Sequence, residues 1–153
     1  MDFRTSVSKN LKAYAQFSGR ASRSEYWWFC AFYMLCILGA SIIDAAAIGI
    51  LQLQTPYFIF SLIVSISLLM PYTGLSWRRL HDIGIAGWLN IPWLLIWIVL
   101  FSYQTQTLAF SNNYNEEAYS VISVFALIVS VPYVVVYLIP SRGTANKYGA
   151  SPD

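Results

Sequence analysis

The sequence predicts an all-α membrane protein with four transmembrane helices, preceded by a short amphipathic helix at the membrane interface. Of the 153 residues, 58% are hydrophobic and only 10% are charged. An ordinary soluble domain carries about 25% charged residues, and this chain has too few to cover the surface of a soluble core. The charges are also clustered, which leaves uncharged runs of 18, 33, 33 and 24 residues.

These uncharged runs define the predicted spans. A helix needs about 20 apolar residues to cross a hydrocarbon core of about 30 Å. The predicted spans cover residues 27–51, 57–77, 88–103 and 119–139. Their apolar residues are consecutive rather than alternating with polar ones, which favours helices over the strands of a membrane barrel. We therefore expect residues 1–153 to form one integral-membrane domain.

The segment before the first span, residues 1–24, carries an amphipathic pattern. Phe3, Val7, Leu11 and Tyr14 recur at spacings of four and three, which places them on one face of a helix. A helix of this kind lies in the interface with its apolar face in the acyl region. The alternative is a poorly ordered tail.

The positions of Lys and Arg predict the orientation. All nine precede the first span, join the second to the third, or follow the fourth, and residues 52–56 and 104–118 contain none. Positive residues concentrate in cytoplasmic loops. We therefore expect both termini, including the tail 140–153, in the cytoplasm.

Asp44 is the one acidic residue within a predicted span. It follows Trp27 by 17 residues, which is about 26 Å along a helix and close to the outer headgroups. We expect a solvated interfacial aspartate in preference to an ion-translocating one.

Two polar segments flank the predicted spans. In the first, Ser22 and Glu25 have the spacing of a capping box, in which Ser22 accepts from the Glu25 N–H and Glu25 returns the bond. In the second, Arg78 and Asp82 are four apart and can pair if the second span continues as helix. Gly84 is a natural stop for that helix.

Three stretches resemble a known family: residues 17–29, residues 78–84 with Gly87 and Trp88, and Pro140 followed by Gly143, Asn146, Tyr148, Gly149 and Pro152. On them the chain resembles the small bacterial inner-membrane family catalogued as domain of unknown function 805 (YhaH-like). Ile85 departs from the family, which often has a basic or polar residue there. The resemblance implies a multi-pass protein of the bacterial inner (plasma) membrane and brings no established activity.

The predicted topology brings these stretches to the cytoplasmic face, where we expect one polar cluster. Its candidate members are Arg20, Arg23, Glu25, Arg78, Arg79, His81 and Asp82, with Asn146 and Tyr148 as secondary candidates. Four arginines against two acids leave a positive surplus, and guanidinium groups suit phosphate geometry. The expected ligands are anionic lipid headgroups, a small anion or a partner protein. The alternative is that these charges only pair with one another and lock the helix ends.

Other functions have weaker support in the sequence. His81 and Asp82 could act as a general base and its orienting partner, but there is no second His and no Gly-rich phosphate loop. Cys30 and Cys36 are six apart and do not form a metal-binding pair. We expect no catalytic residue, metal or cofactor, and the net charge of +2 argues against nucleic acid. A homo-oligomer or a membrane-protein partner stays open, and a small oligomeric transporter or channel is the alternative function.

Overall fold

The computed structural model describes residues 1–51, 58–109, 116–141 and 143–152. Its elements are α1 (Phe3–Lys12), α2 (Arg23–Leu51), α3 (Ile59–Asp82), the short 3₁₀ helix η1 (Gly87–Leu89), α4 (Asn90–Ala109) and α5 (Glu116–Leu138). Within the described ranges, β structure is limited to one isolated bridge between Asn146 and Gly149. The predicted all-α class is confirmed.

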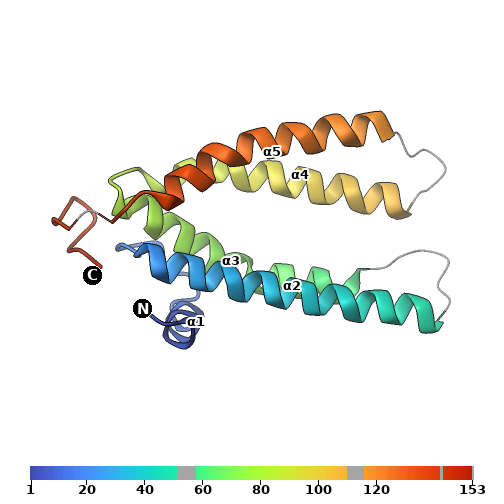
Figure 1. Ribbon diagram of the computed structural model, residues 1–153, viewed down its shortest axis with the longest axis horizontal. Helices are drawn as coiled ribbons and strands as arrows, with labels where there is room; N and C mark the ends of the chain where they lie inside the picture. The colour runs from blue at the N-terminus through green and yellow to red at the C-terminus, as the bar shows by residue number, and fades with distance from the viewer. Residues whose placement is uncertain (52–57, 110–115, 142, 153) are drawn as a thin grey trace.

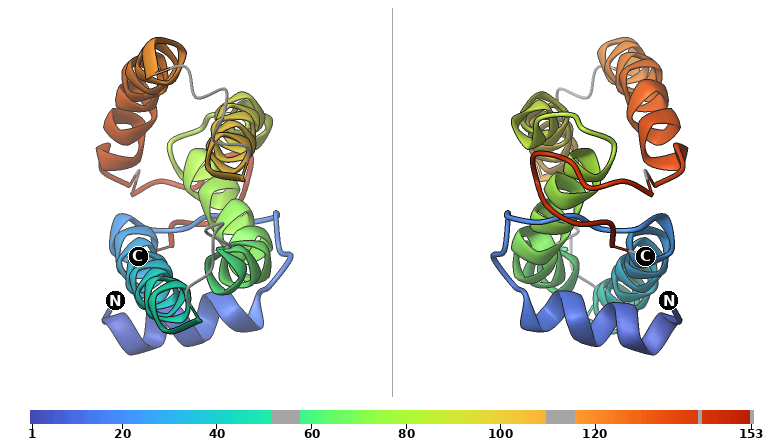
Figure 2. Two further views of the ribbon diagram at one scale, coloured as in Figure 1. Left: turned by 90° about the vertical axis from the view of Figure 1, so that its right-hand side faces the viewer. Right: turned by 90° about the vertical axis from the view of Figure 1, so that its left-hand side faces the viewer.

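The four long helices form two antiparallel hairpins that meet at one end of the molecule. Helices α2 and α3 make one hairpin, α4 and α5 make the other, and the two diverge towards the opposite end (Figure 1). Helix α1 lies across α2 and α3, on the side away from α4 and α5 (Figure 2). Both chain termini lie where the hairpins meet, and we call this region, which holds the start of α2 and the ends of α3 and α5, the polar end.

Away from the polar end the helices expose apolar side chains. Ile50 of α2 is 80% exposed and Leu127 of α5 is 70% exposed. By length and composition, α2 and α3 can cross a membrane, and shorter apolar stretches occupy Gly87–Val99 and Ser123–Leu138 of the described residues. Exposed apolar surface on this scale marks an apolar environment or partner.

Several helix ends differ from the predicted spans. Helix α3 continues to Asp82, past the predicted end at residue 77. Its last turn contains the basic residues Arg79 and His81, and basic side chains stabilise the negative end of the helix dipole. Helix α4 runs to Ala109, so part of the predicted loop 104–118 is helical. Residues 52–57, which include the start of the second predicted span, lie outside the described residues.

The core lies beside the polar end, where the hairpins meet. Its buried residues come from the N-terminal segment and from α2, α3 and α5: Ala21, Tyr26, Phe29, Cys30, Leu75, Leu80 and Tyr137. The Tyr26 ring stacks on the Tyr137 ring with 4.4 Å between centroids, and its hydroxyl lies 3.1 Å from that of Tyr72. Aromatic contacts therefore join the two hairpins directly beneath the charged residues described below.

Helix α1 is amphipathic, as predicted, and its inner face is polar. Phe3 packs edge-on against the Trp28 ring at 5.9 Å. The residues that α1 buries are Ser6 and Asn10, which lie four apart beside the apolar stripe. Helix α1 is therefore attached to the first hairpin largely by polar contacts.

Asp44 is buried, so the expectation of a solvated interfacial aspartate is wrong. Its side chain is 1% exposed and accepts from the backbone N–H groups of Phe60 (2.9 Å) and Ser61 (2.8 Å) and from the Ser61 hydroxyl (2.7 Å). The first N–H groups of a helix have no intrahelical partner, and the N-cap residue Phe58 supplies none from its side chain. Asp44 of α2 therefore caps α3 across the hairpin.

Two glycines shape the chain near the polar end. Gly84 has φ of +85° and follows the last residues of α3, as predicted for the stop of that helix. At Gly74, a Cβ would lie 2.9 Å from the backbone oxygen of Gln16. The absence of a side chain at Gly74 lets the segment between α1 and α2 cross α3 in close contact.

Candidate functional site

One buried carboxylate at the polar end faces two arginines. Asp82 pairs with Arg20, with Oδ1 at 2.7 Å from Nη2 and 2.9 Å from Nε, and with Arg79 through Oδ2. Asp82 and Arg79 are fully buried, and Arg20 is 7% exposed. We call Arg20, Arg79 and Asp82 the Asp82 group. The predicted Arg78–Asp82 pair is not formed, because the charged partner on the Asp82 side of α3 is Arg79, three residues earlier.

Arg79 also joins three parts of the chain through backbone carbonyls. Its guanidinium donates to the carbonyls of Tyr137 and Ile139 at the end of α5 and to that of Ala21 before α2 (3.4 Å). The last carbonyls of a helix lack intrahelical partners and carry the negative end of its dipole. A buried guanidinium there stabilises the end of α5 and fixes it to α3.

A second buried carboxylate, Glu25, links α1, α2 and α3. Its Oε2 lies 2.6 Å from Lys9 Nζ and its Oε1 lies 3.5 Å from Arg78 Nη1. Arg78 also donates to Asn10 Oδ1 at 2.7 Å, and the Ser6 hydroxyl donates to the Glu25 carbonyl at 2.6 Å. We call Lys9, Glu25 and Arg78 the Glu25 group.

The capping box is half formed. The Glu25 N–H donates to the Ser22 hydroxyl at 3.4 Å, as predicted. The Glu25 carboxylate does not return the bond, because it pairs with Lys9 and Arg78 instead. Hydrogen bonds between charged groups are stronger than those to a neutral backbone N–H. The Glu25 carboxylate therefore binds the two cations rather than the N–H of Ser22.

Arg23 differs from the other candidate arginines because it is exposed. Its guanidinium donates to the Leu138 carbonyl at 3.4 Å. Arg23 lines a polar hollow between the start of α2 and the chain that leaves α5; the lining residues are Ser22, Arg23, Ser24, Pro140 and Ser141. Arg23 is therefore placed to meet a ligand at the surface.

His81 is covered by the C-terminal tail. Its ring stacks on that of Tyr148, with centroids 3.8 Å apart and planes 4° apart, and its Nδ1–H donates to the Gly19 carbonyl (3.2 Å). His81 lies four residues beyond Trp77, the last residue of the predicted span, and is therefore outside that span. Burial lowers the pKa of His81; the bond to Gly19 opposes this shift and the Lys147 charge adds to it.

The secondary candidates lie beside this group. Asn146 donates through Nδ2 to the His81 carbonyl at 2.9 Å and to the Asp82 carbonyl at 3.4 Å. Its Oδ1 accepts from the Tyr148 N–H at 2.8 Å. Asn146 and Tyr148 therefore hold the tail against the end of α3.

Sequence reasoning missed three members of the site: Ser6, Lys9 and Asn10 of α1. Ser6 and Asn10 are polar residues four apart, next to the apolar stripe of α1, and this spacing indicates a second buried face. Lys9, one position before Asn10, completes the Glu25 group. These residues could have been found by asking which polar residues of the amphipathic helix border its apolar face.

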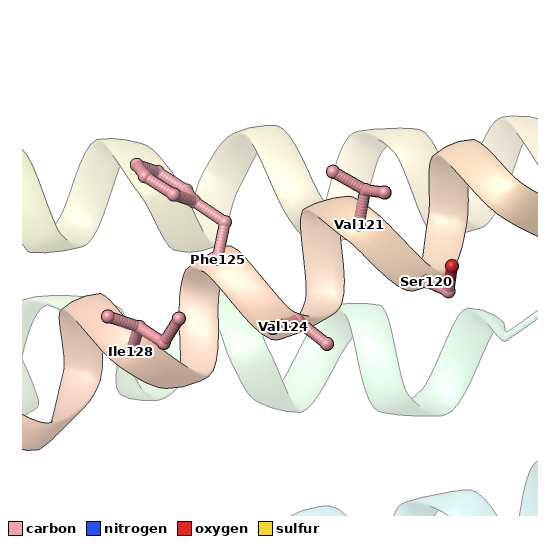
Figure 3. A pocket seen from close by; sticks show the side chains of 5 residues that line it. All are labelled: Ser120, Val121, Val124, Phe125 and Ile128. Atoms are coloured by element: carbon pink, nitrogen blue, oxygen red, sulfur yellow. The ribbon is translucent and has the colours of Figure 1, made fainter.

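A second hollow lies on α5 and offers little chemistry. It is lined by Ser120, Val121, Val124, Phe125 and Ile128, and Val121 and Phe125 project from the same side of the helix (Figure 3). This surface is apolar apart from one hydroxyl. Over the described residues, no group of three or more His, Cys, Asp and Glu is placed to hold a metal ion.

The long apolar helices, their exposed apolar side chains and the charged residues gathered at the polar end are those of a helical membrane protein. The family model described as "Protein of unknown function (DUF805)" matches residues 14–150, and the chain belongs to this family. The resemblance inferred from the three motifs is confirmed.

Two relatives of this chain are inner membrane proteins of Escherichia coli. Inner membrane protein YhaI of Escherichia coli (strain K12) is 35% identical over 111 residues, which is 70% of this chain and 89% of that protein. Inner membrane protein YhaH of the same strain is 30% identical over 99 residues, which is 61% of this chain and 72% of that protein. No solved structure matches this chain.

Proposed function

We propose that this is a non-enzymatic inner-membrane protein with four transmembrane helices, whose polar end lies at the cytoplasmic membrane surface and binds the headgroup phosphate of anionic lipids. One observation carries the proposal: both acids of the charged cluster are buried, whereas exposed basic residues outnumber exposed acids among the described side chains. Glu25 and Asp82 are fully buried. Asp2 is the one exposed acid among the described side chains, against five exposed basic residues: Arg4, Lys9, Lys12, Arg23 and Lys147.

Helix length supports the four spans. Helices α4 and α5 have 20 and 23 residues, or about 30 and 35 Å at 1.5 Å per residue. Both lengths match the hydrocarbon core of a bilayer. The basic residues support the orientation, since six of them lie at the polar end: Lys9, Arg20, Arg23, Arg78, Arg79 and Lys147. A seventh, Arg142, is outside the described residues. The positive-inside rule then favours a cytoplasmic polar end.

Reporter fusions will test this orientation. A reporter active only in the cytoplasm is expected to work when it follows the C-terminus, and one active only in the periplasm is expected to work at position 113. Position 113 lies in the range 110–115, outside the described residues. A C-terminal fusion that is active only in the periplasm would contradict the proposal.

The hollow beside Arg23 is the proposed phosphate site. Ser22 and Ser24 supply hydroxyls 3.1 Å apart, and Arg23 supplies a guanidinium that suits phosphate oxygens. The other candidate arginines are engaged inside the protein with Asp82, Glu25 and backbone carbonyls. Burial of Arg20, Arg78 and Arg79 supports a structural role for these three side chains. Of the four candidate arginines, Arg23 alone is exposed and can reach a headgroup.

Substituting Arg23 will test the phosphate site. A hydrogen bond to a charged group contributes about 1.5–3 kcal/mol, so R23Q should bind phosphatidylglycerol at least about tenfold more weakly. Native mass spectrometry of protein titrated with this lipid measures the loss, with zwitterionic phosphatidylethanolamine as the comparison lipid. The melting temperature of R23Q should stay close to that of the unmodified protein.

Arg4 provides the matched control, because it is an exposed arginine on α1 and does not line the hollow. Neutralising one basic residue near an anionic surface costs about 1 kcal/mol, so R4Q should weaken binding only about fivefold. Equal losses in R4Q and R23Q would indicate a diffuse basic surface. Unchanged binding in R23Q would contradict the site.

Two other functions receive less support from the geometry. His81, the candidate general base, is covered by Tyr148 and donates to Gly19. Asp44, the candidate for ion translocation, uses both carboxylate oxygens to cap α3. The proposal therefore assigns neither residue to catalysis or transport.

A further inference from the structure

The tail after α5 forms a tight turn over residues 144–149, which we call the C-terminal turn. Asn146 and Gly149 close it through two backbone hydrogen bonds of 3.1 and 3.0 Å. Gly149 has φ of +131°, a conformation that favours glycine. The turn lies against the N-terminal segment and the end of α3.

Few contacts hold this turn. Arg20 Nη1 donates to the carbonyls of Thr144 (2.8 Å) and Gly149 (3.3 Å). Further contacts are the Asn146 bonds to the end of α3 and the stack of Tyr148 on His81. Four of the six residues of the turn are exposed: Thr144, Ala145, Lys147 and Gly149. Segments with little buried apolar surface open at a lower free energy than the core.

The groups around His81 disfavour a second proton on its ring. Lys147 lies on the turn, with Nζ 4.9 Å from the Tyr148 ring centre, and Arg20 comes from the N-terminal segment. Three further charged residues lie on α3 beside His81: Arg78, Arg79 and Asp82. The Asp82 carboxylate is already paired with Arg20 and Arg79. An imidazolium would therefore add a positive charge near that of Lys147, on a residue that is only 8% exposed.

We propose that the C-terminal turn is a pH-sensitive cover that leaves the polar end when His81 takes up a second proton. An exposed His has a pKa of about 6.5, whereas burial under the turn lowers the pKa of His81. Protons therefore bind the open form more tightly than the covered form. Between the two pKa values, each unit of acidification weakens docking by up to about tenfold. Opening also removes two carbonyl partners of Arg20.

A direct test follows the titration of His81, the single histidine of the chain. NMR of full-length protein in lipid nanodiscs, labelled with ¹⁵N-histidine, gives the His81 pKa without assignment. The expected pKa is below 6.5 in the unmodified protein and closer to 6.5 in N146A, which loses the bonds that fix the turn. Equal pKa values in the two proteins would overturn the proposal.

A second measurement follows the turn itself. A nitroxide at the exposed position 145, introduced by A145C in a C30A/C36A background, should become mobile between pH 8 and pH 5.5. In H81Q, which keeps an N–H donor for Gly19 but does not titrate, label mobility should not change with pH. A label at exposed Ser8 of α1 (S8C) controls for general effects of pH. An immobile turn at both pH values, or the same response in H81Q, would contradict the proposal.

Discussion

Replacing Asp82 with alanine is expected to destabilise the protein by about 3–5 kcal/mol, the range for breaking a buried ion pair by removing one partner. Asp82 pairs with both Arg20 and Arg79, and both arginines are buried. Unfolding in mixed detergent micelles, followed by circular dichroism, measures the change in free energy.

Arg4→Ala is the control for Asp82→Ala. Arg4 is charged and exposed, so its loss should change stability by no more than about 0.5 kcal/mol. Asp82→Asn should fall between the two, because the amide keeps a hydrogen-bond acceptor but loses the charge. A stable Asp82→Ala protein would mean that the Asp82 group does not hold the polar end together.

Glu25→Ala is expected to cost about 3 kcal/mol and to release α1 from the first hairpin. It leaves Arg78, which is 3% exposed, without its carboxylate. It also removes the charged partner of Lys9 in α1. Hydrogen exchange should therefore increase over α1 (Phe3–Lys12) and much less over α3.

Lys9→Gln tests the Lys9–Glu25 pair separately from the Arg78–Glu25 pair. The Lys9 side chain is 42% exposed, so water compensates for much of its loss, and the expected cost is at most about 1 kcal/mol. If Lys9→Gln is as damaging as Glu25→Ala, attachment of α1 rather than neutralisation of Arg78 dominates the stability of this group.

The long helices and the end of the bundle at which the charged residues gather could be predicted, because both depend on position along the chain. Uncharged runs longer than a bilayer crossing predict long helices regardless of how they pack. Chain order then assigned Arg20, Glu25, Arg78 and Asp82 to one end of the bundle. The ion pairs Arg20–Asp82 and Glu25–Arg78 each link residues more than 50 positions apart in the sequence.

The pairing within the cluster could not be predicted because it depends on rotation about the helix axis. Arg78 and Arg79 differ by about 100° around α3. Arg78 consequently meets Glu25 and Asn10, whereas Arg79 meets Asp82 and the end of α5. Sequence spacing alone gave Arg78 the wrong acid.

The capping role of Asp44 could not be predicted without knowing how α2 and α3 are aligned in the first hairpin. Depth along α2 was estimated from sequence, but the burial of Asp44 depends on Phe60 and Ser61 lying opposite it. The small residue Ser61 also places a hydroxyl within 2.7 Å of the carboxylate. An acid near a span end that faces the start of the next helix can therefore be a cap rather than a solvated group.

The central claim is that buried ion pairs between the N-terminal segment and α3 hold the polar end together. A double-mutant cycle between Arg20 and Asp82 tests it most directly, using Arg20→Gln, Asp82→Asn and the double variant in the same unfolding assay. Because the pair is buried and bonded at 2.7 Å, the predicted coupling is about 1.5–3 kcal/mol. Additive effects, within about 0.5 kcal/mol, would contradict the claim.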